Sequence, residues 1–141
     1  MRKLSLDLGT RTCGFAITDS DCILATGLDN YRFEENNFSK VVEQVKFYIE
    51  KYKDIDTLVL GHPLRSNNTK SERTLMVEEF KIILENEFKL PVVLVNEHSS
   101  TKAAEDILIQ VGYTRKKRKG VKDKLAAQLI LEDYLNYYLK K

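Results

Sequence analysis

The chain has 141 residues and nearly balanced charges, with 23 Lys and Arg against 21 Asp and Glu and a formal net charge of +2 at pH 7. This length predicts a single domain, residues 1–141, that buries roughly two thirds of its unfolded surface and leaves no room for a second catalytic domain. Cys13 and Cys22 form no CxxC pair and have no Cys/His cluster nearby, which argues against structural zinc and favours reduced thiols in the cytoplasm.

The first thirty residues predict an antiparallel meander of three strands. Leu4, Leu6 and Leu8 alternate with polar residues, so one face of the first strand enters the core and Asp7 lies on the other face. Further strands are predicted at residues 15–18 and 22–28. Because Asp7 and Gly9 interrupt the apolar residues that follow the N-terminus, we expect neither a signal peptide nor a membrane span.

The middle of the chain alternates amphipathic helices with short apolar strands. Helical spacing predicts a helix over residues 38–52, followed by a buried strand over residues 57–60. Ser71 is expected to cap a second helix. Its inward-facing residues are predicted to be Leu75, Val77, Phe80, Ile83 and Leu84. A strand over residues 92–95 and a helix that stops near Gly112 follow.

An unbroken run of positive residues opens the C-terminal part. The basic run consists of Arg115, Lys116, Lys117, Arg118 and Lys119. Such a run is either a nucleic-acid contact or a solvated loop, and its charge predicts a loop that does not pack. The final helix is then expected from about Val121, with Asp123 in its first turn and on the same face as Ala126 and Ala127.

The predicted order of elements gives a mixed α/β sheet with helices on its faces. If the first strand lies parallel to the later ones, Asp7 and Glu97 share the carboxyl edge, where such folds bind ligands. The two small alanines would let the last helix approach the sheet and bring Asp123 to the same place. Three converging carboxylates repel one another unless a divalent cation lies among them.

These three acids predict a metal-dependent phosphodiesterase. Oxygen ligands alone favour Mg²⁺ or Mn²⁺, and two such ions ~4 Å apart can promote displacement at phosphorus. We therefore expect Asp7, Glu97 and Asp123 to be both the catalytic and the metal-binding residues, and the basic run to bind nucleic-acid phosphates. Each acid taken alone also fits a turn, a strand end or a helix N-terminus. His62 and His98 fit a loop, a substrate contact or a general base.

Four segments together resemble the YqgF family, whose members are described as Holliday junction resolvases and as pre-16S ribosomal RNA nucleases. They are LDLGTRTCGFAITD, GHPL, NEHSSTKAAEDIL and DKLAAQLILEDYL, and they span essentially the whole chain in order. The resemblance implies a ribonuclease H-like fold with a five-stranded mixed sheet of order 3-2-1-4-5 and helices on both faces. It also implies catalytic acids at Asp7, Glu97 and Asp123.

The chain departs from the family pattern beside Glu97. Asn96 and His98 stand where the family usually has Asp and Arg, so an acid and a constant positive charge are missing. The expected function is a metal-dependent endonuclease acting on structured RNA, as in pre-16S rRNA 5′-end processing, or on branched DNA, as in Holliday junction resolution. A junction resolvase would act as a homodimer, whereas an rRNA-trimming enzyme could act alone.

Two other functions fit the same residues. The DLGT segment and its hairpin also resemble the first phosphate loop of the actin and sugar-kinase superfamily, which leaves a nucleotide-binding ATPase-like domain as an alternative. The short chain argues against this, because those enzymes clamp ATP between two such domains. A non-catalytic nucleic-acid-binding module with a vestigial metal site is the other alternative.

Overall fold

The computed structural model describes residues 1–63, 70–96 and 106–139, and these residues form a five-stranded sheet. The strand order is β3-β2-β1-β4-β5. The strands are β1 (Arg2–Leu8), β2 (Thr12–Thr18), β3 (Ala25–Arg32), β4 (Ile55–His62) and β5 (Val92–Asn96). This is the order that the resemblance to the YqgF family implies.

β1 lies at the centre of the sheet and joins its two halves. It pairs antiparallel with β2 on one side and parallel with β4 on the other, and β5 continues the parallel half. The carboxyl ends of β1, β4 and β5 therefore lie along one edge of the sheet. This carboxyl edge is the place where Asp7 was expected.

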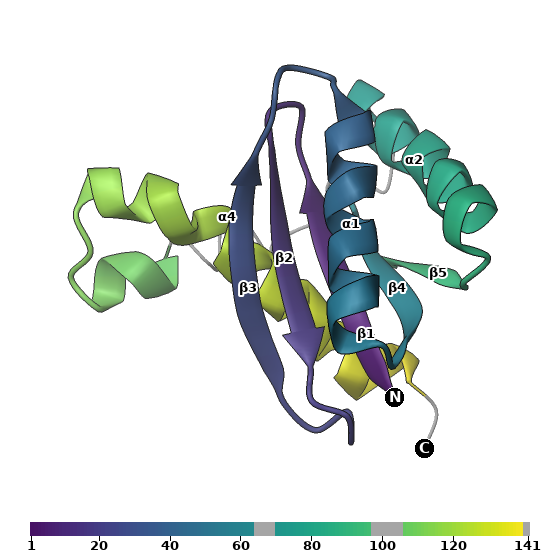
Figure 1. Cartoon of the computed structure of the whole chain (residues 1–141). Coiled ribbons are helices and arrows are strands. Elements are labelled where there is room, and N and C mark those ends of the chain that lie inside the picture. Colours follow the sequence, from purple (N-terminus) through teal and green to yellow (C-terminus); the bar gives the residue numbers. More distant parts are fainter. Residues whose placement is uncertain (64–69, 97–105, 140–141) are drawn as a thin grey trace.

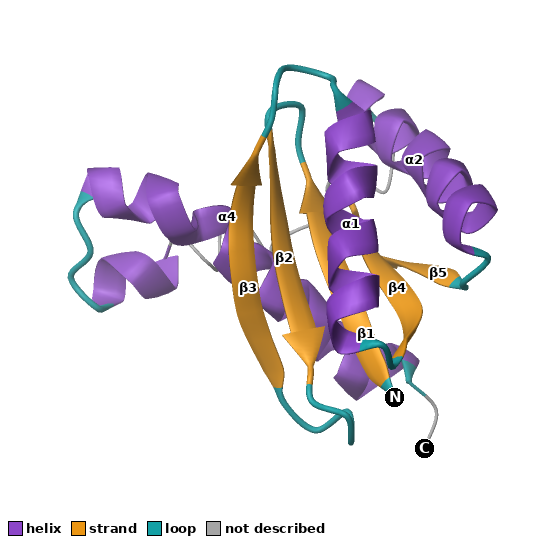
Figure 2. Cartoon of the chain, viewed as in Figure 1, coloured by secondary structure: helices purple, strands orange, loops and turns teal. Residues whose placement is uncertain are grey.

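Helices cover both faces of the sheet, as predicted (Figures 1 and 2). α1 (Phe38–Tyr52) and α2 (Glu72–Phe88) lie on one face. α4 (Arg115–Asp133) crosses the other face and continues into a π-helical turn, η1 (Tyr134–Tyr138). No helix within the described ranges has the length and apolar character needed to span a bilayer.

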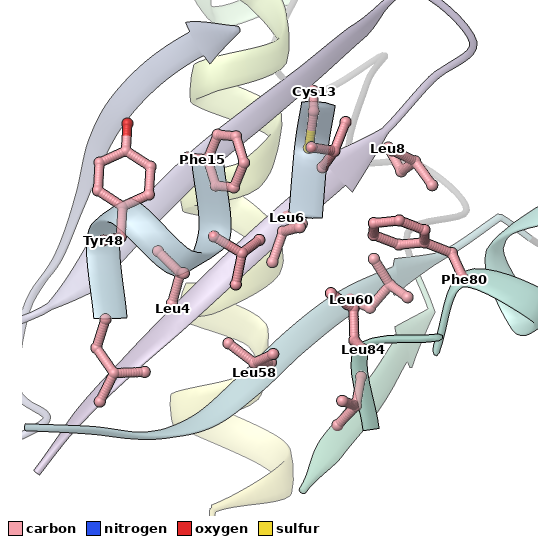
Figure 3. Packing of buried hydrophobic residues seen from close by; sticks show 14 of the residues in the cluster. Leu4, Leu6, Leu8, Cys13, Phe15, Tyr48, Leu58, Leu60, Phe80 and Leu84 are labelled. Atoms are coloured by element: carbon pink, nitrogen blue, oxygen red, sulfur yellow. The ribbon is translucent and has the colours of Figure 1, made fainter. Parts of the chain in front are cut away.

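The face under α1 and α2 is filled by large apolar side chains. Leu4, Leu6 and Leu8 of β1 point into this layer together with Phe15 of β2, and all four are fully buried (Figure 3). The helices contribute the other half of the layer: Val41, Val45 and Tyr48 from α1, and Val77, Phe80 and Leu84 from α2. The period-two alternation of β1 therefore predicted its buried face correctly.

Two residues of α2 and one strand boundary differ from the prediction. α2 buries a narrow stripe of Thr74, Val77, Phe80 and Leu84. Leu75 and Ile83 lie one position off this stripe and are 51% and 46% exposed, so their predicted inward orientation is wrong. The third strand begins at Ala25 rather than at Cys22, because residues 22–24 form the turn that precedes it.

The basic run is not a loop, and the last helix begins earlier than predicted. α4 starts at Arg115, where the hydroxyl of Thr114 accepts a hydrogen bond from the backbone N–H of Lys117. Lys and Arg have good helix propensity, so clustered charge did not prevent a helix from forming. Asp123 consequently lies in the third turn of α4 and not in its first turn. The preceding helix does end at a turn with Gly112, as expected.

Candidate active site

Asp7 lies near the end of the central strand, on the face covered by α4. The pleat of β1 sends Leu6 and Leu8 to one face and Ser5 and Asp7 to the other. Ser5 confirms the direction, because its hydroxyl donates a hydrogen bond of 2.7 Å to the carbonyl of Ala127 in α4. The Asp7 side chain is only 4% exposed, so its negative charge requires compensation from nearby groups.

Part of this compensation comes from Arg73, the second residue of α2. Its Nη2 lies 3.0 Å from Asp7 Oδ1, and the same guanidinium donates to the carbonyl of Leu8 at 2.9 Å and 3.2 Å. Arg73 therefore reaches the carboxyl edge from the opposite side of the sheet. A charge-assisted bond of this kind stabilises a buried carboxylate.

Asp123 reaches the same region from α4. Its Oδ2 accepts a hydrogen bond of 2.6 Å from the hydroxyl of Thr12, at the start of β2. Burial is the largest influence on this carboxyl and raises its pKa; the Thr12 hydrogen bond lowers the pKa, and the negative charge of Asp7 raises it. The electrostatic influence of Asp7 on Asp123 indicates that the two acids share one site.

Gly14 explains how α4 comes so close to the strands. It pairs directly with Asp7 across β1 and β2, so a Cβ at position 14 would project from the same face as the Asp7 side chain. Such a Cβ would lie 1.9 Å from the backbone carbonyl oxygen of Asp123. Only glycine permits this contact, and it brings the Asp123 backbone against the strand position opposite Asp7.

The two alanines of α4 complete this close packing. Ala126 and Ala127 have no exposed surface, and Ala127 belongs to the buried cluster between α4 and the sheet. From the sequence, these small residues were expected to let the helix approach the sheet and to bring Asp123 toward Asp7. That geometric expectation is confirmed, although Asp123 lies two turns further into the helix than predicted.

The third predicted acid, Glu97, and the neighbouring His98 lie outside the described residues. Glu97 directly follows Asn96, the last residue of β5, and Asn96 pairs with His62 at the end of β4. Within residues 1–63, 70–96 and 106–139, no group of three His, Cys, Asp or Glu side chains could hold a metal ion. The role of Glu97 as a ligand therefore stays a prediction.

His62 occupies a defined position at the carboxyl end of β4. Its Nε2 lies 2.9 Å from a carboxylate oxygen of Glu78 in α2, and Lys70 also contacts that carboxylate. The Lys70 and His62 hydrogen bonds lower the pKa of Glu78. Of the roles left open by the sequence, the contact with Glu78 supports a structural one.

Three residues that shape this site were not predicted from the sequence: Thr12, Gly14 and Arg73. Gly14 carried a recognisable signal, because a glycine within a strand often marks a close approach of another segment. Thr12 and Arg73 carried none, since their partners are 111 and 66 residues away. Both contacts depend on the tertiary fold.

Comparison with known proteins identifies the family. A family model described as RuvX, Holliday junction resolvase, matches residues 1–137. The chain belongs to the RuvX family. This confirms the resemblance to YqgF, which is the same family.

Relatives and solved structures agree with this assignment. Proteins named "Putative pre-16S rRNA nuclease" from Mycoplasmopsis pulmonis and Ureaplasma parvum serovar 3 are 48% and 44% identical to this RuvX chain; the matches cover 99% and 96% of it, and 95% and 97% of the relatives. The fowlpox virus resolvase in its complex with Holliday junction DNA superimposes with a TM-score of 0.58 at 18% identity, over 99% of this chain and 100% of the resolvase. RuvC of T. thermophilus in its junction complex also has a TM-score of 0.58, at 12% identity, over 96% and 95%. These structures confirm the ribonuclease H-like fold.

Proposed function

We propose that the protein is a metal-dependent endonuclease that hydrolyses phosphodiester bonds in structured nucleic acid. The observation that carries this proposal is the buried Asp7 at the carboxyl edge, beside a second carboxylate, Asp123, whose pKa is raised. Family membership and a sheet of resolvase topology support the same reaction class. We assign Asp7, Glu97 and Asp123 as the catalytic acids.

The donor set fits a hard divalent cation. Asp7 and Asp123 offer oxygen atoms only. The pKa of Asp123 is raised chiefly by burial and to a smaller extent by the negative charge of Asp7, and a bound cation would stabilise the ionised carboxylates. When bound, Mg²⁺ or Mn²⁺ supplies the Lewis acidity that activates water and stabilises the leaving oxygen, and two ions are the arrangement expected for in-line displacement at phosphorus. Asp7, Glu97 and Asp123 would hold them.

The other residues of the site have supporting roles in this proposal. Thr12 donates to one oxygen of Asp123 and fixes the orientation of the carboxylate, which leaves the other oxygen for a ligand. Gly14 sets the separation between α4 and the strands. The basic run, Arg115–Lys119, lies at the start of the same helix and is assigned to phosphate binding.

We propose pre-16S rRNA 5′-end processing as the reaction, because the relatives with 48% and 44% identity bear that name. Holliday junction resolution is the second candidate, favoured by the family description and by the fold shared with two junction resolvases. We further propose that residues 1–141 act as one nuclease domain in the cytoplasm. A homodimer is required only for paired cuts in a junction.

The test is a parallel cleavage assay with a ribosomal RNA precursor and a four-way DNA junction, each in Mg²⁺ or Mn²⁺. Cleavage of the RNA alone supports rRNA processing, and paired cuts in the junction alone support resolution. Asp7→Asn should reduce either activity by roughly a thousandfold, since loss of metal catalysis removes several kcal/mol of transition-state stabilisation. Asp21→Asn, a change at an exposed turn residue, is the matched control and should retain activity.

Three results would contradict the proposal in different ways. Nucleic-acid binding without cleavage under every metal condition would identify a binding module. Tight Mg²⁺-ATP binding measured by calorimetry, together with no cleavage, would identify the ATPase-like alternative. Cleavage that is unchanged in Asp7→Asn would remove Asp7 from the reaction.

A further inference from the structure

Arg73 places a permanent positive charge on the carboxylate that the proposed metal site depends on. The distance from Nη2 to Asp7 Oδ1 is 3.0 Å, and Asp7 is 4% exposed whereas Arg73 is 40% exposed. A guanidinium cannot lose its proton in a protein, so this charge is present at every working pH. Asp7 is therefore partly neutralised before any cation arrives.

A divalent cation and the Arg73 guanidinium compete for the same negative charge. A cation held by the Asp7 carboxylate would share it with the guanidinium that already donates to Oδ1. Two positive charges at one carboxylate repel each other appreciably in a partly buried site. Arg73 also acts on Asp123, since its charge lowers the pKa of that carboxyl. This repulsion lowers the affinity of the site for the cation.

The position of Arg73 is fixed by its surroundings and not by Asp7 alone. α2 begins one residue earlier, behind a capping box in which Ser71 and Thr74 satisfy each other's backbone and side-chain groups. The guanidinium also donates twice to the carbonyl of Leu8, from Nε and Nη2. The Nε bond to Leu8 does not involve the carboxylate, so Arg73 can release Asp7 and stay at the carboxyl edge.

We propose that Arg73 is a positioning residue that holds Asp7 in the metal-free protein, yields the carboxylate to the divalent cation and thereby sets the metal affinity of the site. This proposal rests on the proposed metal-dependent function. It predicts two opposite effects of a single substitution: removal of the guanidinium should destabilise the metal-free protein and increase its affinity for the metal. A residue with a purely structural role would weaken both.

The test uses the whole chain with Mn²⁺ as the probe. Arg73→Gln should lower the thermal midpoint in EDTA, because Asp7 is then buried with less compensation. In calorimetric titration the same variant should bind Mn²⁺ roughly tenfold more tightly, because a like charge has been removed from the site. Arg73→Lys keeps the charge and should bind Mn²⁺ with nearly the wild-type affinity. Lys70→Gln removes a neighbouring charge that pairs with Glu78 instead, and should change neither quantity appreciably.

A measurement on the wild-type protein covers the case in which Arg73→Gln does not fold. The ¹⁵N resonance of Arg73 Nε should shift as Mg²⁺ is added, with a dissociation constant equal to the one that calorimetry gives for Mg²⁺, and Asp7→Asn should abolish the shift. A signal that does not move, or Mn²⁺ affinity that is equal or lower in Arg73→Gln, overturns the proposal. Mn²⁺ binding that is the same in wild type and Asp7→Asn overturns the metal site itself, and with it the proposed function.

Discussion

The two faces of the sheet pack in different ways near Asp7. Under α1 and α2 the layer consists of leucines, valines and aromatic rings, with Phe80 and Phe15 among the largest fully buried side chains. The α4 face has an apolar cluster of its own, in which Ile130 and Leu131 are fully buried. At the strand position opposite Asp7, however, Gly14 lets the backbone of α4 approach the sheet closely. Apolar packing therefore stabilises both faces of β1, and the close approach that serves the two carboxylates lies on the α4 face.

The largest effect on stability is expected on the α1/α2 face. Phe80→Ala removes a 1%-exposed ring that packs 5.8 Å from the ring of Phe38, and should lower the free energy of unfolding by about 3–5 kcal/mol. Denaturant unfolding measures the loss. Cleavage per folded molecule should stay near wild type, because Phe80 belongs to the apolar layer under α1 and α2, on the face of β1 opposite Asp7. Ile82→Ala, at an exposed position of the same helix, should change stability by no more than about 0.5 kcal/mol.

Gly14→Ala should reduce the cleavage rate strongly and the free energy of unfolding only moderately, unlike Phe80→Ala. The new methyl group would overlap the Asp123 carbonyl, and a helix backbone can only relieve the overlap by moving away, at about 1–3 kcal/mol. Displacing a catalytic group by about 1 Å can reduce the rate by roughly a hundredfold. Gly27→Ala is the control, because its methyl group would meet the side chains of Lys124 and Gln128 and not the helix backbone. Equal activities of these two variants would show that the close approach of α4 is not needed.

Asp123→Asn tests the α4 face through the raised pKa of Asp123, because Asn has nearly the same size as Asp and leaves the packing unchanged. A carboxyl with a raised folded-state pKa contributes stability that is fully present below the ordinary value of 3.8 and is lost as pH rises through the raised value. Asp123→Asn removes this dependence and can still accept the Thr12 hydrogen bond. In EDTA its thermal midpoint should exceed that of wild type by an amount that grows as pH rises from 4 to 8.

A divalent metal should reverse the order of the thermal midpoints of the wild type and Asp123→Asn. With Mn²⁺ at neutral pH the wild type should be stabilised and Asp123→Asn should not, which differential scanning calorimetry can measure. Asp21→Asn, at an exposed position, should follow the wild type in both conditions. A midpoint difference that shrinks with rising pH would contradict the assigned sign.

The smallest expected effect is on the salt dependence of nucleic-acid binding, when lysines of α4 or of α1 are neutralised. Lys116→Gln combined with Lys117→Gln should reduce the salt dependence of nucleic-acid affinity, by roughly 0.7–0.9 in slope for each phosphate that the protein no longer neutralises. Lys46→Gln combined with Lys51→Gln removes the same charge from α1, on the opposite face, and should leave the slope unchanged. Fluorescence anisotropy at several salt concentrations gives both slopes. Similar slopes for the two double variants would remove the basic run from the interface.

The sequence predicted most of the fold because local and long-range signals agreed. α1 matches its predicted bounds since its apolar stripe is strong and Lys53 ends it in a left-handed conformation. Prediction failed where they disagreed. Ile23 and Leu24 look like strand residues, yet they are exposed in a turn, because pairing with β2 begins only at Ala25. The charge of the basic run concealed a helix whose stability comes from packing further along.

The candidate site was predictable to the extent that strand ends and residue size determine it. Asp7 could be placed from the alternation of β1, and the approach of Asp123 could be inferred from two alanines. The number of helical turns that precede Asp123 could not be predicted, because it depends on Thr114, the residue that caps the start of α4. Arg73 could not be found either, since only the folded sheet brings the start of α2 to the end of β1.

α4 runs unbroken from Arg115 to Asp133, and its first turns extend past β3 and beyond the sheet (Figure 1). Lys117, at the centre of the basic run, is six positions from Asp123, or about 9 Å along the helix axis. Under the proposed function, α4 fixes the distance between the phosphates bound by the basic run and the phosphodiester that is cleaved near Asp123. Insertion of one residue between them would rotate the basic run by about 100° around the helix axis. The position of cleavage should therefore be sensitive to insertions in α4 and tolerant of insertions in loops.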